Sequence, residues 1–138
     1  TITLEAWDNK YKPNQDWNHA WGAAPANLIP RKLMGIAPLE PGFKKIRIKP
    51  QPGNLKHAEI KHPTIRGTVK ASFINHPNES FRLEVDIPVN TTAKVYLPFY
   101  SKKQTFHKDG KLVPYKREGS FSVIENIGSG KHSFLVEQ

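Results

Sequence analysis

Hydrophobic residues recur along this 138-residue chain with two different periods, and the first period is helical. Between about residues 16 and 34, apolar residues return roughly every 3.6 positions, which is typical of an amphipathic helix. Asp16 is suited to cap the start of this helix, and Gly35 is suited to end it. Pro25 and Pro30 interrupt the pattern, so we expect a kinked or broken helix. The apolar positions are Trp17, Ala20, Trp21, Ala24, Leu28 and Leu33.

Beyond residue 43 the hydrophobic period becomes two, which indicates half-buried β-strands. In "FRLEVDI" (81–87) the four apolar residues fall on one face and the three charged residues on the other. "KKIRIK" and "GTVKASF" alternate in the same way, whereas "APLEPGF" (37–43) is expected to be a rigid connector. Turn sequences rich in Gly, Pro and Asn separate the strand-like segments. The other predicted strands are 55–61, 93–100, 105–108, 111–115, 121–125 and 131–136.

Several short strands at this spacing predict a mainly β fold, an antiparallel β-sandwich preceded by a short helical segment. A hydrophobic fraction of 37% and a charged fraction of 24% suit a globular protein. The chain has no cysteine, which excludes disulfides and thiolate metal sites. No apolar run reaches the roughly 18–20 residues of a membrane span. Because "TITLEAW" has no initiating methionine and reads like the middle of a domain, we expect a piece of a longer protein.

The net charge of +9 lies entirely in the predicted sandwich, because residues 1–42 contain four basic and four acidic residues. A basic domain can bind nucleic acid. Here, however, the lysines are scattered along strands and turns, without a recognition-helix pattern or an aromatic RNA-stacking motif. We therefore interpret them as a solvated basic face and expect no nucleic-acid partner.

The β region offers little candidate chemistry. Its five histidines lack the spacing of metal ligands, and we predict neither a metal site nor a cofactor there. Four aromatic residues lend themselves to a platform on which sugars stack, although packing in the core or at an edge is the favoured alternative. They are Tyr96, Phe99, Tyr100 and Phe106.

The opening segment "LEAWDNKYKPNQDWNHAWG" is more informative, because it combines a carboxylate, an imidazole and all three tryptophans. Glu5 beside Trp7 is a candidate proton acceptor among aromatic walls. His19, between Trp17 and Trp21, is suited to hydrogen-bond a sugar hydroxyl. Indole faces stack on the C–H surfaces of sugar rings, so the cluster suits a carbohydrate site. The alternative is that the tryptophans are ordinary core residues.

The order of four motifs resembles the C-terminal end of bacterial α-L-rhamnosidases of glycoside hydrolase family 78. The motifs are "TITLEAW", "DWNHAWG", "LMGIAPLEPGFKKIRIKPQPG" and "VDIPVNTTAKVYLP". In that family the first two close an (α/α)6 catalytic barrel, and the others belong to a C-terminal β-sandwich. The resemblance therefore implies that residues 1–37 are the helical end of a barrel and residues 38–138 are the sandwich.

The same resemblance implies inverting hydrolysis of terminal α-L-rhamnosides. Glu5 matches the general base, His19 a sugar-binding histidine and Trp7 a wall of the pocket. The implied partners are a rhamnose-containing glycan and the upstream barrel, with no cofactor or metal. The family's general acid lies upstream of these residues, so the isolated chain is expected to be inactive. The alternative is a carbohydrate-binding β-sandwich without catalytic activity, which would use exposed aromatic residues such as Tyr100.

Overall fold

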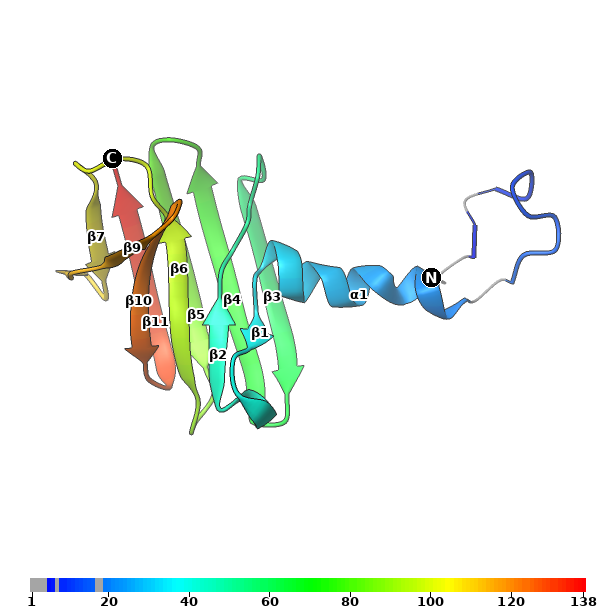
Figure 1. Ribbon diagram of the computed structural model, residues 1–138, viewed down its shortest axis with the longest axis horizontal. Helices are drawn as coiled ribbons and strands as arrows, with labels where there is room; N and C mark the ends of the chain where they lie inside the picture. Colours follow the sequence, from blue (N-terminus) through cyan, green and yellow to red (C-terminus); the bar gives the residue numbers. More distant parts are fainter. Residues whose placement is uncertain (1–4, 7, 17–18) are drawn as a thin grey trace.

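The computed structural model describes residues 5–6, 8–16 and 19–138, and it consists of two stacked β-sheets with a helical arm projecting from one edge (Figure 1). The first sheet has five strands and the second has six. In spatial order, the five-stranded sheet comprises β1 (Ala37–Pro38), β2 (Lys45–Ile48), β6 (Thr92–Pro98), β10 (Phe121–Ile127) and β9 (Lys116–Glu118). The six-stranded sheet comprises β3 (His57–Thr64), β4 (Gly67–His76), β5 (Ser80–Ile87), β11 (Gly130–Glu137), β7 (Thr105–Lys108) and β8 (Lys111–Leu112).

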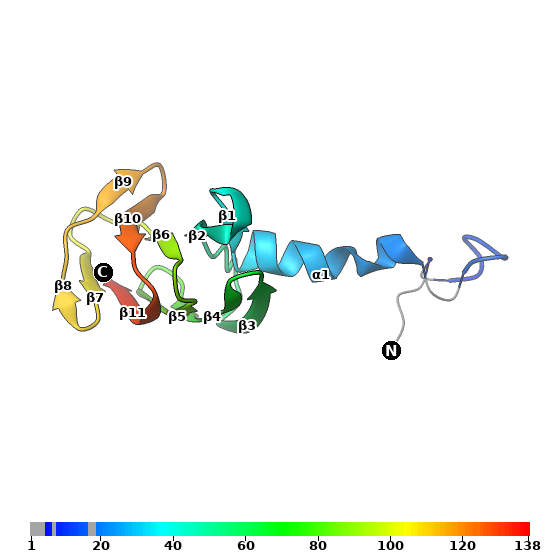
Figure 2. The ribbon, with the colours of Figure 1, turned by 90° about the horizontal axis from the view of Figure 1, so that it is seen from below.

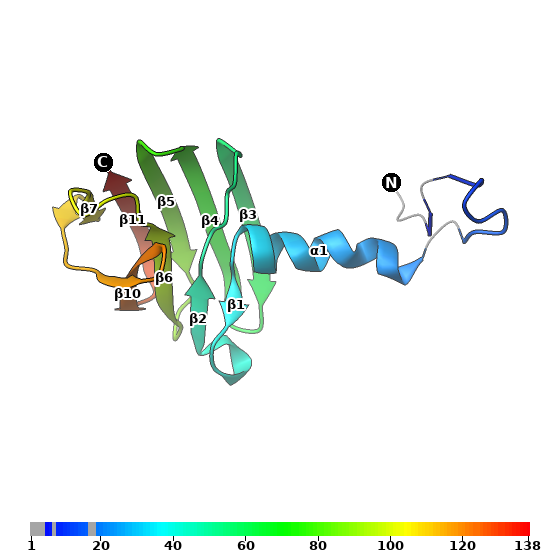
Figure 3. The same cartoon turned by 45° about the horizontal axis from the view of Figure 1, so that its top comes forward.

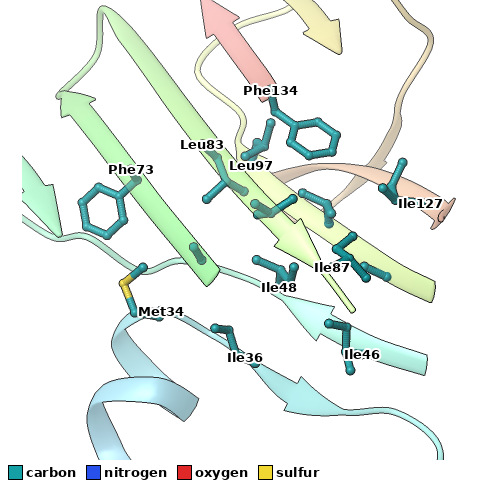
Figure 4. Packing of buried hydrophobic residues seen from close by; sticks show 14 of the residues in the cluster. Met34, Ile36, Ile46, Ile48, Phe73, Leu83, Ile87, Leu97, Ile127 and Phe134 are labelled. Carbon is teal, nitrogen blue, oxygen red and sulfur yellow. The ribbon is translucent and has the colours of Figure 1, made fainter. Parts of the chain in front are cut away.

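The predicted β-sandwich is confirmed, with its core between the two layers (Figure 2). The alternation in β5 buries one face completely, since its four apolar side chains are 0–4% exposed. β2 and β4 contribute in the same way, and Figure 4 shows their side chains meeting those of the opposite sheet. Burial of this apolar surface stabilises the fold by roughly 25 cal/mol per Å² removed from water.

One pair of strands departs from the predicted antiparallel arrangement. β2 and β6 are neighbours and run parallel, with Ile46 opposite Ala93 and Ile48 opposite Val95. The chain between them forms β3, β4 and β5 of the other sheet, so it returns to the first sheet in the original direction. A period of two sets which face of a strand is buried, but it does not set the direction of the neighbouring strand.

The connector and the segment after β7 differ from the secondary structure that the sequence predicted. Residues 37–43 contain β1 and a 3₁₀ turn, η3 (Pro41–Phe43). The predicted strand 111–115 is reduced to β8, and β9 follows it unpredicted. Asp109 and Gly110 both have positive φ, which gives the two-residue hairpin that "DG" predicts between β7 and β8.

The arm is an interrupted helix, as its two prolines predicted. It consists of a 3₁₀ turn η1 (Ala20–Ala23), an α-helix α1 (Ala24–Leu28) and a π-helical turn η2 (Ile29–Leu33). Pro25 and Pro30 each lie in the first positions of a new segment, where a missing backbone donor costs little. Among the described residues, no helix is long and apolar enough to cross a membrane.

The start of the arm differs from the prediction, whereas its end agrees with it. Asp16 is not its N-cap, because the first turn begins at Ala20 and His19 occupies the cap position. Asp16 is held by the preceding loop instead. Gly35 ends the arm in the left-handed conformation, with φ 70°, as a terminating glycine does.

Candidate functional site

The candidate site lies at the far end of the arm, where residues 5–6 and 8–16 belong to a loop whose two ends meet (Figure 3). Three hydrogen bonds join the two ends of the loop. The Glu5 amide donates to the Asp16 carbonyl at 3.4 Å, and the Asp16 amide donates to Glu5 Oε2 at 2.7 Å. The Ala6 amide donates to Gln15 Oε1 at 3.1 Å. The loop thus fixes the Glu5 carboxylate beside Asp16, just before the helical arm begins.

Glu5 is the least accessible charged side chain of this loop, with 2% of it exposed. Its Oε2 accepts the Asp16 amide, and its Oε1 accepts a hydrogen bond from the Lys12 ammonium. The hydrogen bond from Lys12 lowers the pKa of Glu5 below its usual range, and the Asp16 amide lowers it further. Glu5 is therefore an ionised carboxylate at neutral pH.

The structure brings His19 to Glu5, as the hypothesis of a shared site requires. His19 Nδ1 lies 3.2 Å from Asp16 Oδ2 and 3.8 Å from Glu5 Oε1. The ring of Trp21 lies against His19, with 4.2 Å between the ring centroids, and its Nε1 donates to the Glu5 carbonyl at 3.2 Å. Trp7, the third predicted site residue, lies outside the described residues, as does Trp17.

This arrangement offers a proton acceptor, an imidazole and an indole face within one small volume. Ligand atoms of Glu5, Asp16 and His19 lie within 4.8 Å of one another, a spacing that a cation could bridge. Lys12 already supplies a positive charge to the Glu5 carboxylate. Sequence reasoning missed Lys12 and the role of Asp16, because both contacts depend on how the loop closes.

The four aromatic residues considered as a sugar platform do not form an open surface. Phe106 is 1% exposed and belongs to the core, and Tyr100 packs against the core with its hydroxyl buried. Tyr96 is covered by Lys49 and Lys94, each 5.2 Å from its ring centroid. Phe99 is covered in the same manner by a guanidinium, 4.3 Å from its ring centroid. The packing interpretation of these residues is therefore the correct one.

Comparison with known proteins places the sandwich in a family. Residues 35–111, more than half of the chain, match the model of the bacterial alpha-L-rhamnosidase C-terminal domain. An alpha-L-rhamnosidase of Streptomyces avermitilis is 29% identical over 99% of this chain, and one of Formosa agariphila is 38% identical over 65%. The chain spans only 14% and 10% of the lengths of these two relatives.

Solved structures show the same fold. The alpha-L-rhamnosidase of Streptomyces avermitilis complexed with L-rhamnose superposes with a TM-score of 0.78 and 26% identity, over 99% of this chain and 14% of that one. The alpha-L-rhamnosidase from Dictyoglumus thermophilum gives a TM-score of 0.86 at 24% identity, over 100% of this chain and 16% of that one. The likeness extends over the arm as well as the sandwich.

Proposed function

The chain belongs to the bacterial alpha-L-rhamnosidase C-terminal domain family, and we propose that it is the C-terminal part of a glycoside hydrolase that cleaves terminal α-L-rhamnosides. In this proposal residues 1–37 end the catalytic barrel and residues 38–138 form the sandwich that follows it. The similarity to alpha-L-rhamnosidases of Streptomyces avermitilis and Formosa agariphila supports the substrate class.

Glu5 acts as the general base of an inverting reaction. It takes a proton from the water that attacks the anomeric carbon, while a second carboxyl group protonates the leaving oxygen. That acid comes from residues outside this chain, and an inverting enzyme holds the two carboxyl groups roughly 6.5–9.5 Å apart to admit the water. His19 binds a sugar hydroxyl, and Trp7 forms a wall of the pocket.

The observation that carries this proposal is the short separation of 3.8 Å between Glu5 Oε1 and His19 Nδ1. A base and a sugar-binding group must reach the same ring, so they must lie side by side. Glu5 is ionised at neutral pH, as a carboxylate must be before it can accept a proton. Lys12 occupies Oε1 here, so bound water must take its place or share that oxygen.

The test uses the complete parent enzyme and the variant Glu5→Gln. Loss of the base should lower kcat on an aryl α-L-rhamnoside by about 10²–10⁴-fold, with the melting temperature unchanged. Glu79→Gln, in the turn between β4 and β5, is the matched control and should keep the wild-type rate. An unchanged kcat in Glu5→Gln would exclude Glu5 as the base.

Two further measurements separate the parts of the proposal. NMR of the first turnovers should show β-L-rhamnose before mutarotation, and the α anomer would show a retaining mechanism instead. The 138-residue chain alone should have no turnover, because one carboxylate cannot supply both the acid and the base. Measurable hydrolysis by the isolated chain would contradict that expectation.

A further inference from the structure

The outer face of the six-stranded sheet is hollowed across β3, β4, β5 and β11. The hollow has a volume of about 820 Å³, within the 300–1,000 Å³ range of ligand pockets. Apolar side chains of these strands face the core, so charged and hydroxyl side chains line the hollow. We call it the polar groove and define it by Glu59, Lys61, Lys70, Glu84, Asp86 and Lys131.

Strand register arranges the groove in two parallel rows. The basic row crosses the four strands as Lys61, Lys70, Asp86 and Lys131. The acidic row crosses them as Glu59, Ser72, Glu84 and Ser133. Neighbouring strands lie about 4.8 Å apart, and the rows are two residues apart along each strand, which is about 7 Å. The groove therefore presents a line of mostly donors beside a line of mostly acceptors.

Most of the charged side chains of the groove have no partner among the residues that the structure describes. In the basic row the one ion pair among described residues joins Lys70 Nζ and Asp86 Oδ2 at 3.3 Å. The side chains of Lys61, Lys131, Glu59 and Glu84 make no hydrogen bond or ion pair with another described residue. Glu59 and Glu84 lie diagonally across from lysines of the basic row, where Cα atoms are about 7–8 Å apart. This spacing leaves donors and acceptors available to a molecule that lies between the rows.

The turn between β7 and β8 closes one end of the groove with a fixed carboxylate. Asp109 Oδ1 accepts the Ser133 amide at 2.8 Å, and Oδ2 lies 3.1 Å from His132 Nδ1 and 2.7 Å from Lys108 Nζ. His132 Nε2 lies 3.1 Å from the Gly128 carbonyl. Burial raises the pKa of Asp109, but these partners together hold it well below its usual range. This end of the groove is therefore ordered before any ligand arrives.

We propose that the polar groove binds an oligosaccharide, which deepens the proposed function by giving the sandwich a sugar-binding role. Each sugar hydroxyl both donates and accepts, so it can accept from a lysine of the basic row and donate to a glutamate of the acidic row. A nucleic acid backbone would be repelled by Glu59 and Glu84, and a protein partner would find few apolar side chains to bury. Hydroxyl-rich molecules match both rows at once.

The test is an NMR titration of the ¹⁵N-labelled 138-residue chain with an oligosaccharide ending in α-L-rhamnose, and with maltotetraose and cellotetraose. Saturable shifts are expected for the amides of Ser72, Glu84 and Ser133 with at least one of these sugars. Glu84→Gln and Lys131→Met should each weaken binding about 10-fold or more, as the loss of a hydrogen bond to a charged group does. Glu79→Gln and Lys102→Met, exposed residues outside the groove, should bind like the wild type.

Two outcomes overturn the proposal: no saturable shift in the groove with any of the three sugars, or wild-type affinity in both groove variants. Thermal melts of the variants check that folding is intact, since both side chains are exposed. Glu5→Gln should leave the shifts of the groove amides Ser72, Glu84 and Ser133 as in the wild type, whereas the proposed role of Glu5 as base predicts loss of turnover in the parent enzyme. The titration therefore tests sugar binding by the groove, and the activity of the parent enzyme tests the catalytic role of Glu5, so either hypothesis can fail without the other.

Discussion

The arm and the sandwich use the same kinds of apolar residue in opposite ways. In the arm, Trp21 is 63% exposed, Leu28 52% and Ile29 48%. In the sandwich, the corresponding core side chains are at most a few per cent exposed, as Leu83 and Phe134 at 0% show. The sandwich completes its core from its own strands, whereas the arm displays apolar surface that requires a partner. In the proposed function, a catalytic barrel covers this surface.

The change from one region to the other takes place within a few residues. Leu28 is half exposed, but Met34 and Ile36 are 1% and 0% exposed and pack into the core (Figure 4). The Gln51 amide donates to the Leu33 carbonyl at 2.8 Å, which ties the end of the arm to the sandwich. The arm projects from this fixed end (Figure 1), and Glu5 and His19 lie at its other end.

The largest expected effect contrasts an aromatic residue of the core with a leucine of the arm. Phe134→Ala should lower the free energy of unfolding by about 3–5 kcal/mol, because it leaves a cavity between the sheets. Leu28→Ala should change it by less than about 0.5 kcal/mol, because this side chain is already half in water. Urea unfolding of the 138-residue chain measures both values. Similar losses in the two variants would show that the arm is as tightly packed as the core.

The next effect concerns the junction itself. A Cβ at Gly35, where φ is +70°, would lie 1.9 Å from the Lys49 carbonyl oxygen, whereas one at Gly53, where φ is +53°, would meet nothing within 4 Å. Gly53→Ala should cost about 1 kcal/mol for the left-handed backbone alone. Gly35→Ala should cost about 1–3 kcal/mol more, because the backbone must also move. Equal melting temperatures for the two variants would contradict this close approach.

The smallest expected effect is a dependence of sandwich stability on pH. The pKa of Asp109 is lower in the folded chain than the unfolded value of about 3.9, so its carboxylate stabilises the fold above that pH and loses this effect as pH falls below it. Asp109→Asn should therefore lower the free energy of unfolding by about 1 kcal/mol at pH 7, a modest amount because 41% of the side chain is exposed to screening water.

The same comparison at pH 3 should show a smaller difference, because the carboxylate is then largely protonated in the unfolded wild-type chain, whereas the folded chain still keeps it ionised. Asp8→Asn in the exposed loop of the arm is the control, with a change under about 0.5 kcal/mol at pH 7. A difference between Asp109→Asn and wild type that stays constant from pH 7 to pH 3 would show that charge is not the cause.

Strands were predictable where the alternation of apolar and polar residues was strict. β4 and β5 lie where "GTVKASF" and "FRLEVDI" placed them, with the same residues inside. β9 was missed because "KRE" contains no apolar residue, and its place comes from pairing with β10. The prediction that Asp16 caps the helix was wrong. The Asp16 amide donates to the Glu5 carboxylate across the loop, and the first helical turn begins only at Ala20.

In the candidate site, too, the sequence indicated some residues and only the structure revealed others. Glu5, His19 and Trp7 were chosen from residue types and a motif, and the structure places Glu5 beside His19. The contact of Lys12 with Glu5 could not be predicted, because the two residues are seven positions apart in a loop, where no periodic pattern relates them. The sequence also did not predict the polar groove. Lysines and glutamates on the outer face of a sheet are typical of an ordinary solvated surface, and the order of the strands must be known before their two rows can be recognised.

The sequence by itself determined which residues are buried, where the chain turns and which family it resembles, because these depend on local patterns and ordered motifs. Only the tertiary structure decided the parallel pairing of β2 with β6, the ion pair of Glu5 with Lys12 and the two rows of the groove. Each of these joins residues that are separated by a turn or several strands. Such contacts depend on strand order, strand direction and loop closure, which hydrophobic periodicity does not encode.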